Sequence, residues 1–124
     1  MTEFAEARKV AALMAAVAEP TRLRVVWQLA RGPQHVGALA DAVGIKMVNM
    51  SHHLGVMKGA GVLEDTKDGR QVVYRLKPEV FTPSTTPDVL GVLTLGRFRI
   101  VLRAKPEAPP VPPGSKRRGK SSKK

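Results

Sequence analysis

The stretch VGALADAVGIKMVNMSHHLGVMKGAGVLEDTKDGRQVVYRL, residues 36–76, decides the fold of this chain. It starts with apolar residues at the three-and-four spacing of an amphipathic helix, namely Val36, Leu39, Ala40 and Val43. Gly44 follows, where a left-handed residue can end that helix. A second helix begins near Lys46 and stops between Gly59 and Gly61. Three apolar residues share one face of it, namely Met50, Leu54 and Met57.

Two strand-forming runs follow the second helix, at residues 62–66 and 70–76. They flank Lys67-Asp68-Gly69, and Asp-Gly between such runs is a strong signal for a β-hairpin. In the second run an apolar face alternates with a polar or basic one: Val72, Tyr74 and Leu76 against Gln71, Val73 and Arg75. Helix, turn, helix and hairpin in this order predict an α+β fold, mainly α, of the winged helix-turn-helix class.

Five motifs occur in a fixed order between residues 4 and 76. They are Glu19-Pro-Thr-Arg-Leu-Arg24, Leu39-Ala-Asp-Ala-Val-Gly44, Ser51-His-His-Leu54, Met57-Lys-Gly-Ala-Gly-Val-Leu63, and Asp68-Gly-Arg70 with Tyr74. Their order and spacing resemble those of the arsenic-repressor-type (ArsR) family of bacterial transcriptional regulators, over roughly three fifths of the chain. The resemblance implies a regulator that binds double-stranded DNA as a homodimer, with the first helix in the dimer interface.

The outward face of the second helix is expected to read DNA. Opposite Met50 lie small or polar residues, Val48, Asn49, His52 and Gly55, with Ser51, His53 and Lys58 on the flanks. A helix in the major groove needs a face without acidic groups, because these would repel phosphates. Asn49 can bond adenine and Val48 can pack on a thymine methyl group, which favours a half-site containing A·T pairs. Met47 is expected in the core.

The family pattern Ser-x-His-Leu matches Ser51 to Leu54, so the resemblance implies that Ser51 and His53 bond phosphates or base edges. The basic hairpin is expected to grip the phosphate backbone or to enter the minor groove. The expected DNA-binding residues are therefore Lys46, Val48, Asn49, Ser51, His52, His53 and Lys58 of the helix, and Lys67, Arg70 and Arg75 of the hairpin.

No metal site or other cofactor is expected. Metal-sensing members of the family place a Cys-x-Cys pair where this chain has His35 and Gly37, and the chain has no cysteine. A single imidazole cannot replace a thiolate pair, so His35 is expected to be exposed or to cap a helix. His52 and His53 point about 100° apart on a helix and do not chelate together. The Asp and His ligands of other members lie on a C-terminal helix that this sequence lacks. With no cysteine and no ligand cluster, the sequence leaves three alternatives for the effector: a small molecule, a partner protein or none.

Composition favours a nucleic-acid partner. The net charge is +11, and it is concentrated near the end: 13 basic and 9 acidic residues precede Arg103, against 8 basic and 1 acidic from Arg103 onward. The sequence has no secretory signal and no apolar run near the ~18 residues of a membrane span, so a cytoplasmic protein is expected. No set of acid, base and nucleophile converges and no phosphate-binding glycine loop occurs. We therefore expect no catalytic residues and no enzyme.

The residues before the helix-turn-helix predict two further helices. Thr2 can cap a helix over about residues 3–18 whose apolar stripe is Phe4, Ala7, Val10, Ala11, Met14 and Val17. This stripe packs on a partner subunit, as the resemblance implies, or only on its own domain. Pro20 begins a helix to about Ala30, with Leu23, Val26, Trp27 and Ala30 toward the core. Arg22 and Arg24 contact phosphates or solvent.

The C-terminal third departs from the family, whose last helix completes the dimer. Residues 77–88 contain three prolines, and residues 89–95 and 97–103 then flank Gly96. Phe98, Ile100 and Leu102 alternate with basic or polar-facing positions, which predicts a half-buried β-hairpin or arm. Three arrangements of this arm are open. It pairs across subunits, it covers the first helix, or its two strands pack within one subunit. The expected organisation is thus a DNA-binding domain at 1–76, a β extension at 77–103 and a disordered Pro/Lys/Arg-rich tail at 104–124.

Two functions from different classes fit these features. The first is a transcriptional regulator, expected to be a repressor, that places two recognition helices in successive major grooves of a pseudo-palindromic site. The second is a sequence-tolerant architectural or RNA-binding protein that depends on its basic tail for affinity.

Overall fold

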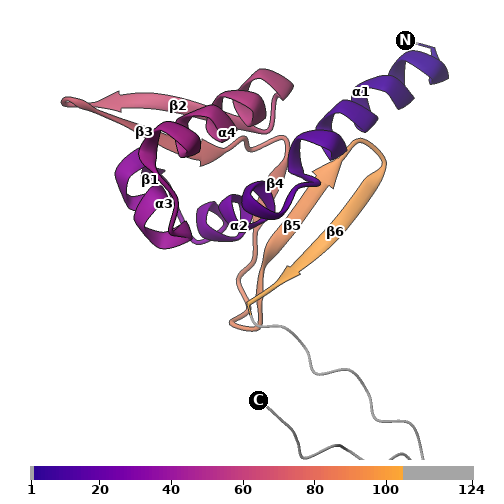
Figure 1. Ribbon diagram of the computed structural model, residues 1–124. Coiled ribbons are helices and arrows are strands. Elements are labelled where there is room, and N and C mark those ends of the chain that lie inside the picture. The colour runs from indigo at the N-terminus through magenta and orange to yellow at the C-terminus, as the bar shows by residue number, and fades with distance from the viewer. Residues whose placement is uncertain (1, 105–124) are drawn as a thin grey trace, which may run out of the picture.

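Ten helices and strands make up residues 2–104, the part of the chain that the computed structural model describes (Figure 1). The helices are α1 (Glu3–Val17), α2 (Pro20–Leu29), α3 (Val36–Val43) and α4 (Met47–Ala60). The strands are β1 (Gln34–His35), β2 (Leu63–Asp68), β3 (Gln71–Leu76), β4 (Phe81–Pro83), β5 (Val89–Leu95) and β6 (Phe98–Arg103). This order confirms the winged helix-turn-helix, while the tail expected to be disordered lies outside the described residues except for Ala104.

Local hydrogen bonds explain where the helices begin. Thr2 Oγ1 accepts from the Ala5 N–H at 3.0 Å, and the Glu19 side chain accepts from the Arg22 N–H at 2.8 Å before Pro20 opens α2. His35 Nδ1 accepts from the Ala38 N–H at 3.3 Å, so His35 is the N-cap of α3, one of the two roles expected for it. Gly44 then ends α3 with φ 80° and begins the turn into α4.

The core forms where the inner faces of the four helices meet. Met50, Leu54 and Met57 of α4 are fully buried, as their spacing predicts. They join other buried residues, including Val25 and Val26 of α2, Leu39 of α3 and Val62 in the connection between α4 and β2. The prediction for α2 was partly wrong, because Trp27 is 49% exposed and Leu23 38% exposed. Val26 is buried as predicted, and Val25 and Leu29 complete the buried face of α2.

Met47 also departs from its predicted place in the core, since it is 57% exposed. It is the first residue of α4, beside the exposed Val48 and Asn49, and the burial of α4 begins only at Met50. The apolar character of Met47 therefore did not indicate whether the first turn of this helix is buried or exposed.

The wing is the antiparallel hairpin β2–β3, paired from Leu63 opposite Leu76 to Asp68 opposite Gln71. Its turn is Gly69-Arg70, with Gly69 at φ 65°, so Lys67 and Asp68 belong to β2 rather than to the predicted turn. The short strand β1, which the sequence did not suggest, pairs with β3 and makes it the central strand. A two-residue strand is too short to produce an alternating pattern.

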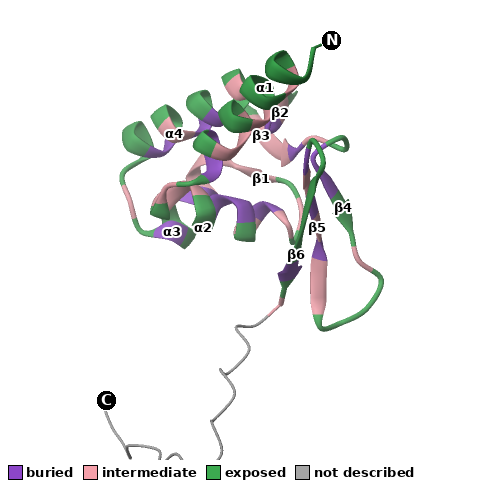
Figure 2. Cartoon of the chain, turned by 90° about the vertical axis from the view of Figure 1, so that its right-hand side faces the viewer, coloured by how far each residue is buried: buried purple, intermediate pink, exposed green. Residues whose placement is uncertain are grey.

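A second sheet follows, in the order β4-β5-β6 (Figure 2). The predicted hairpin β5–β6 is confirmed, with both strands paired inside one chain, and β4 adds a strand that had not been expected. Phe81, Leu93, Leu95 and Leu102 of this sheet join the same core as the helices. The half-buried pattern predicted for β6 was wrong at two places: Phe98 is 56% and Ile100 44% exposed, because this edge strand runs beyond the core.

Within residues 2–104, no helix combines the length and the apolar character that crossing a bilayer requires.

Candidate nucleic-acid interface

The first turn of α4 and the face opposite its buried residues are exposed. Val48 is 71% exposed, and Asn49, Ser51 and His52 are exposed beside it. Lys46, the exposed N-cap residue, stands directly before this face. No acidic residue occurs in α4. One side of the helix is thus fixed in the core, while the other presents small and polar groups to solvent.

His53 lies on the flank of α4 and contacts α2 instead of projecting freely. Its side chain is 19% exposed, and its Nδ1 is 3.2 Å from Arg22 Nη1 and 4.0 Å from Glu19 Oε1. Because the guanidinium can only donate, the contact with Arg22 requires Nδ1 to be an acceptor. Arg22 also donates from Nε to the carbonyl of Ala16 at 2.6 Å. This cluster of Glu19, Arg22 and His53 joins α4 to the corner between α1 and α2.

Lys58 connects the end of α4 to the wing. Its Nζ donates to Asp65 Oδ2 of β2 at 3.0 Å, and this hydrogen bond and the charge of Asp65 raise the pKa of Lys58. The ammonium group is therefore already partly neutralised by a carboxylate. Among the predicted DNA-binding residues, Lys58 and His53 both have partners inside the protein.

The basic residues of the wing fall into two groups. Lys67 and Arg70 are exposed at the tip of the hairpin, whereas Arg75 is half-buried and donates from Nη2 to Thr66 Oγ1 at 3.2 Å. The tip and α3 lie at one end of the molecule, opposite the N-terminal end of α1 and the β5–β6 turn (Figure 1). The two exposed cations are thus at the same end as the helix-turn-helix.

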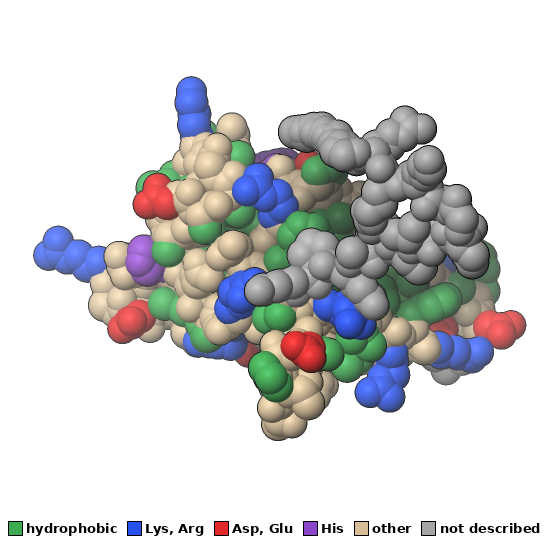
Figure 3. Space-filling model, turned by 90° about the horizontal axis from the view of Figure 1, so that it is seen from below, with side chains coloured by type: hydrophobic (Ala, Val, Ile, Leu, Met, Phe, Trp, Pro, Cys, Tyr) green, Lys and Arg blue, Asp and Glu red, His purple; other side chains and the backbone are tan. Residues whose placement is uncertain are grey.

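On one face of the described part of the chain, the charged side chains are dispersed (Figure 3). Seen from below, Lys and Arg side chains are spread over the face with acidic side chains between them (Figure 3). Residues 2–104 contain no group of three or more His, Cys, Asp or Glu side chains that could hold a metal ion. His52 and His53 contact each other edge to face, with ring centroids 5.9 Å apart. This surface can therefore form hydrogen bonds and ion pairs.

Known proteins share this arrangement. A family model described as a helix-turn-helix domain matches residues 17–66. NmtR of Mycobacterium tuberculosis, a transcriptional regulator, is 39% identical over 70 residues, which are 56% of this chain and 58% of NmtR. A solution structure from Mycobacterium bovis, described as a homodimeric winged helix-turn-helix DNA-binding domain of a possible ArsR-family regulator, matches with a TM-score of 0.58 at 29% identity. That match covers 61% of this chain and 72% of the other.

The transcriptional repressor BigR of Xylella fastidiosa is 34% identical, and the match covers 62% of this chain and 82% of BigR with a TM-score of 0.55. The chain belongs to the ArsR/SmtB family. Members of this family are winged helix-turn-helix transcriptional regulators rather than enzymes. The chain spans just over half the length of the curated relative NmtR. The helix-turn-helix model ends at residue 66, before the C-terminal sheet of this ArsR/SmtB protein begins.

Two features of the interface were not found from the sequence. The Arg22–His53 contact joins residues 31 positions apart, and the Lys58–Asp65 pair joins a helix to a strand. Periodicity describes one element at a time, so it gives no signal for a contact between elements. The motif Glu19-Pro-Thr-Arg22 contains two residues of this cluster. It was identified by its resemblance to the family, and it did not predict their contact with His53.

Proposed function

We propose that this ArsR/SmtB protein is a dimeric regulator, expected to act as a repressor, that lays two copies of α4 in successive major grooves of a pseudo-palindromic DNA site. The observation that carries the proposal is the division of α4 into a fully buried face and an exposed face without acids. The M. bovis relative is described as a homodimeric DNA-binding domain and BigR as a repressor, which supports the same function here.

The residue roles follow from exposure and chemistry. Asn49 and Val48, which are exposed, would read an A·T pair, and the exposed Ser51, His52 and Lys46 would bond bases or phosphates. Lys67 and Arg70 at the wing tip approach the neighbouring backbone or minor groove. Three further residues, His53, Lys58 and Arg75, would reach phosphates from positions held by Arg22, Asp65 and Thr66.

The proposal predicts a two-fold-symmetric binding site. Selection from a random duplex library at near-physiological salt is expected to enrich an inverted repeat whose half-sites contain A·T pairs. Asn49→Ala should relax the preference at one base pair of each half-site, by about 1–3 kcal/mol of discrimination, because it removes two hydrogen bonds to adenine. Lys9→Ala, on α1, serves as a control that should leave the motif unchanged. Recovery of no motif would contradict the proposal.

The architectural alternative is favoured by one observation, the concentration of basic residues after Leu102. A chain ending at Ala104 lacks seven of these cations, Lys105, Lys116, Arg117, Arg118, Lys120, Lys123 and Lys124. We expect it to select the same motif with a smaller dependence of affinity on salt, the slope falling by about 0.9 for each phosphate that the protein no longer neutralises. If the shortened chain loses all DNA binding and the full chain selects no motif, the architectural function replaces the regulator.

A further inference from the structure

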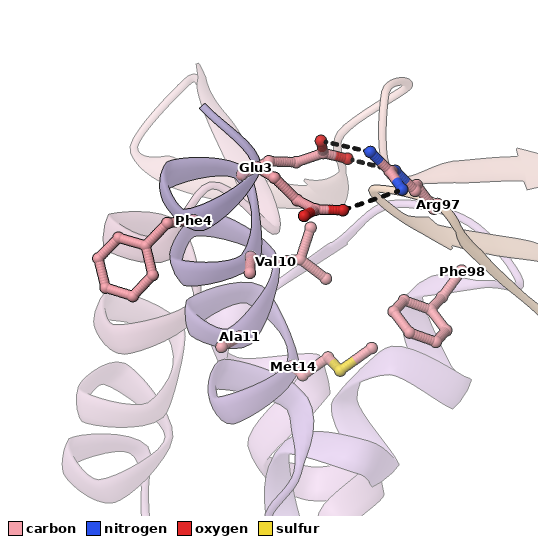
Figure 4. Close-up of a pocket in the computed structure, with 9 residues that line it drawn as sticks. Glu3, Phe4, Val10, Ala11, Met14, Arg97 and Phe98 are labelled. Carbon is pink, nitrogen blue, oxygen red and sulfur yellow. Dashed lines mark hydrogen bonds and ion pairs between the residues drawn. The ribbon is translucent and has the colours of Figure 1, made fainter. Parts of the chain in front are cut away.

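An apolar groove lies along α1 (Figure 4). The N-terminal end of α1 lies at the end of the molecule away from the wing tip (Figure 1). It encloses about 590 Å³ and is lined mainly by Phe4, Ala7, Val10, Ala11, Met14 and Phe98. Phe4 is 72% and Phe98 56% exposed, although both are large apolar side chains. Only Met14 and Val10 of this set are half-buried in the chain by itself. A contiguous apolar surface of this kind is typical of an interaction site.

The wall that β6 adds to the groove is held firmly against α1. Arg97 donates from Nε to Glu6 Oε2 at 2.9 Å and from Nη2 to Glu6 Oε1 at 3.1 Å, and its Nη1 is 4.0 Å from Glu3 (Figure 4). Gly96, at φ 61°, packs so closely on Val10 that a Cβ there would overlap the Val10 side chain. The charged rim is thus internally paired and the groove exists before any partner arrives.

We propose that a second copy of this chain fills the groove, with the two α1 helices antiparallel and Phe98 of β6 packing on the partner's α1. The inference rests on the dimer of the proposed function and adds the β6 wall, where relatives would place a last helix. A two-fold interface requires one surface that carries both a protrusion and its recess. The groove has both, because the protruding Phe4 stands beside Ala7 and Ala11, whose small side chains leave room for another helix to approach.

The charges of the arm favour this arrangement over pairing of two β6 edges. Arg97 lies in the turn just before β6, and Arg99 and Arg103 lie on β6. Antiparallel pairing of two β6 strands centred on Ile100 would set Arg97 opposite Arg103 of the partner subunit, and like charges directly opposite are unfavourable. In the proposed interface the even-numbered face of β6, which carries Phe98 and Ile100, turns toward the partner. At the rim of the groove in each subunit, the charge of Arg97 is already neutralised by Glu6 of the same chain.

The test compares two substitutions of equal exposure on opposite faces of β6. Phe98 and Val101 are both 56% exposed, so Phe98→Glu and Val101→Glu expose similar new charge to solvent in a single chain. By sedimentation equilibrium of the full chain, Phe98→Glu is expected to raise the dimer dissociation constant by about tenfold or more, because it places a charge in an apolar contact. Val101→Glu should change it by less than about twofold.

Two outcomes overturn the inference while leaving the proposed function standing. If both variants dimerise and select the inverted repeat as well as the parent chain, β6 is outside the interface. If both lose dimerisation equally, the even-numbered face has no special role. A parent chain that is monomeric and selects no motif would instead contradict the proposed dimeric regulator.

Cross-linking tests the antiparallel contact without disturbing the groove. Because the chain has no cysteine, Ala11→Cys and Ala12→Cys each introduce a single thiol at an exposed alanine. A short bismaleimide reagent should join two Ala11→Cys chains and leave Ala12→Cys chains largely unjoined, since Ala12 points about 100° away on α1. Equal cross-linking of both variants, or more through Ala12→Cys, would rule out the proposed packing of α1.

Discussion

Leu54→Ala is expected to lower the free energy of unfolding by about 3 kcal/mol, because it removes a fully buried side chain from the middle of α4. Leu54 lies one turn from both Met50 and Met57, which are themselves fully buried, so the surrounding core has little freedom to close the cavity. Urea unfolding at a fixed protein concentration measures the change, since the proposed dimerisation would make the stability depend on concentration.

Val56→Ala provides the matched control on the same helix. Val56 is 37% exposed, so its truncation should cost less than about 1 kcal/mol. Below the unfolding transition, both variants should still select the same DNA motif, because neither Leu54 nor Val56 is among the proposed DNA-contacting residues. Equal decreases in stability from the two substitutions would show that α4 is not anchored through its Met50, Leu54 and Met57 face.

Gly91→Ala is the second substitution with a large expected effect, again about 3 kcal/mol. A Cβ at Gly91 of β5 would overlap both the ring of Phe81 and the carbonyl of Thr82 in the paired strand β4. The carbonyl is backbone and cannot turn away as a side chain would, so β4 must separate from β5 or the sheet must shift. The expected result is a lower urea midpoint, with Phe81 losing its place in the core.

Gly55→Ala is the control for this prediction. Gly55 lies in α4 with no other group within 4 Å of a Cβ placed on it, and alanine forms helix more readily than glycine. We therefore expect Gly55→Ala to raise the free energy of unfolding by about 0.5–1 kcal/mol. If Gly91→Ala is as stable as the parent chain, the close approach of β4 to β5 is not present in solution.

Most of the winged helix-turn-helix was predictable because its signals are local. Helix caps, the left-handed Gly44 and the Asp-Gly signal of the hairpin each act within a few residues, and the spacing of Met50, Leu54 and Met57 identified the buried face of α4. The same local signals also gave the hairpin β5–β6 and its Gly96 turn. Strands β1 and β4 were missed because two or three residues are too few for a pattern.

Burial was harder to predict than helix and strand boundaries. Trp27, Met47, Phe98 and Ile100 are apolar in the sequence but exposed in this chain. The hydrophobicity of a side chain determines the free energy gained when it leaves water, but it does not determine which neighbour covers that side chain. For Phe98, the proposed neighbour is a second copy of the chain.

The sequence by itself determined the four helices, the hairpins β2–β3 and β5–β6 and the buried face of α4, because these depend on signals within a few residues, and the order of its motifs indicated the family. Only the tertiary structure decided that His53 and Lys58 are held by Arg22 and Asp65, and that Arg97 fixes β6 against α1 beside an open groove. These contacts join residues distant in sequence, and their existence depends on how the elements pack in space.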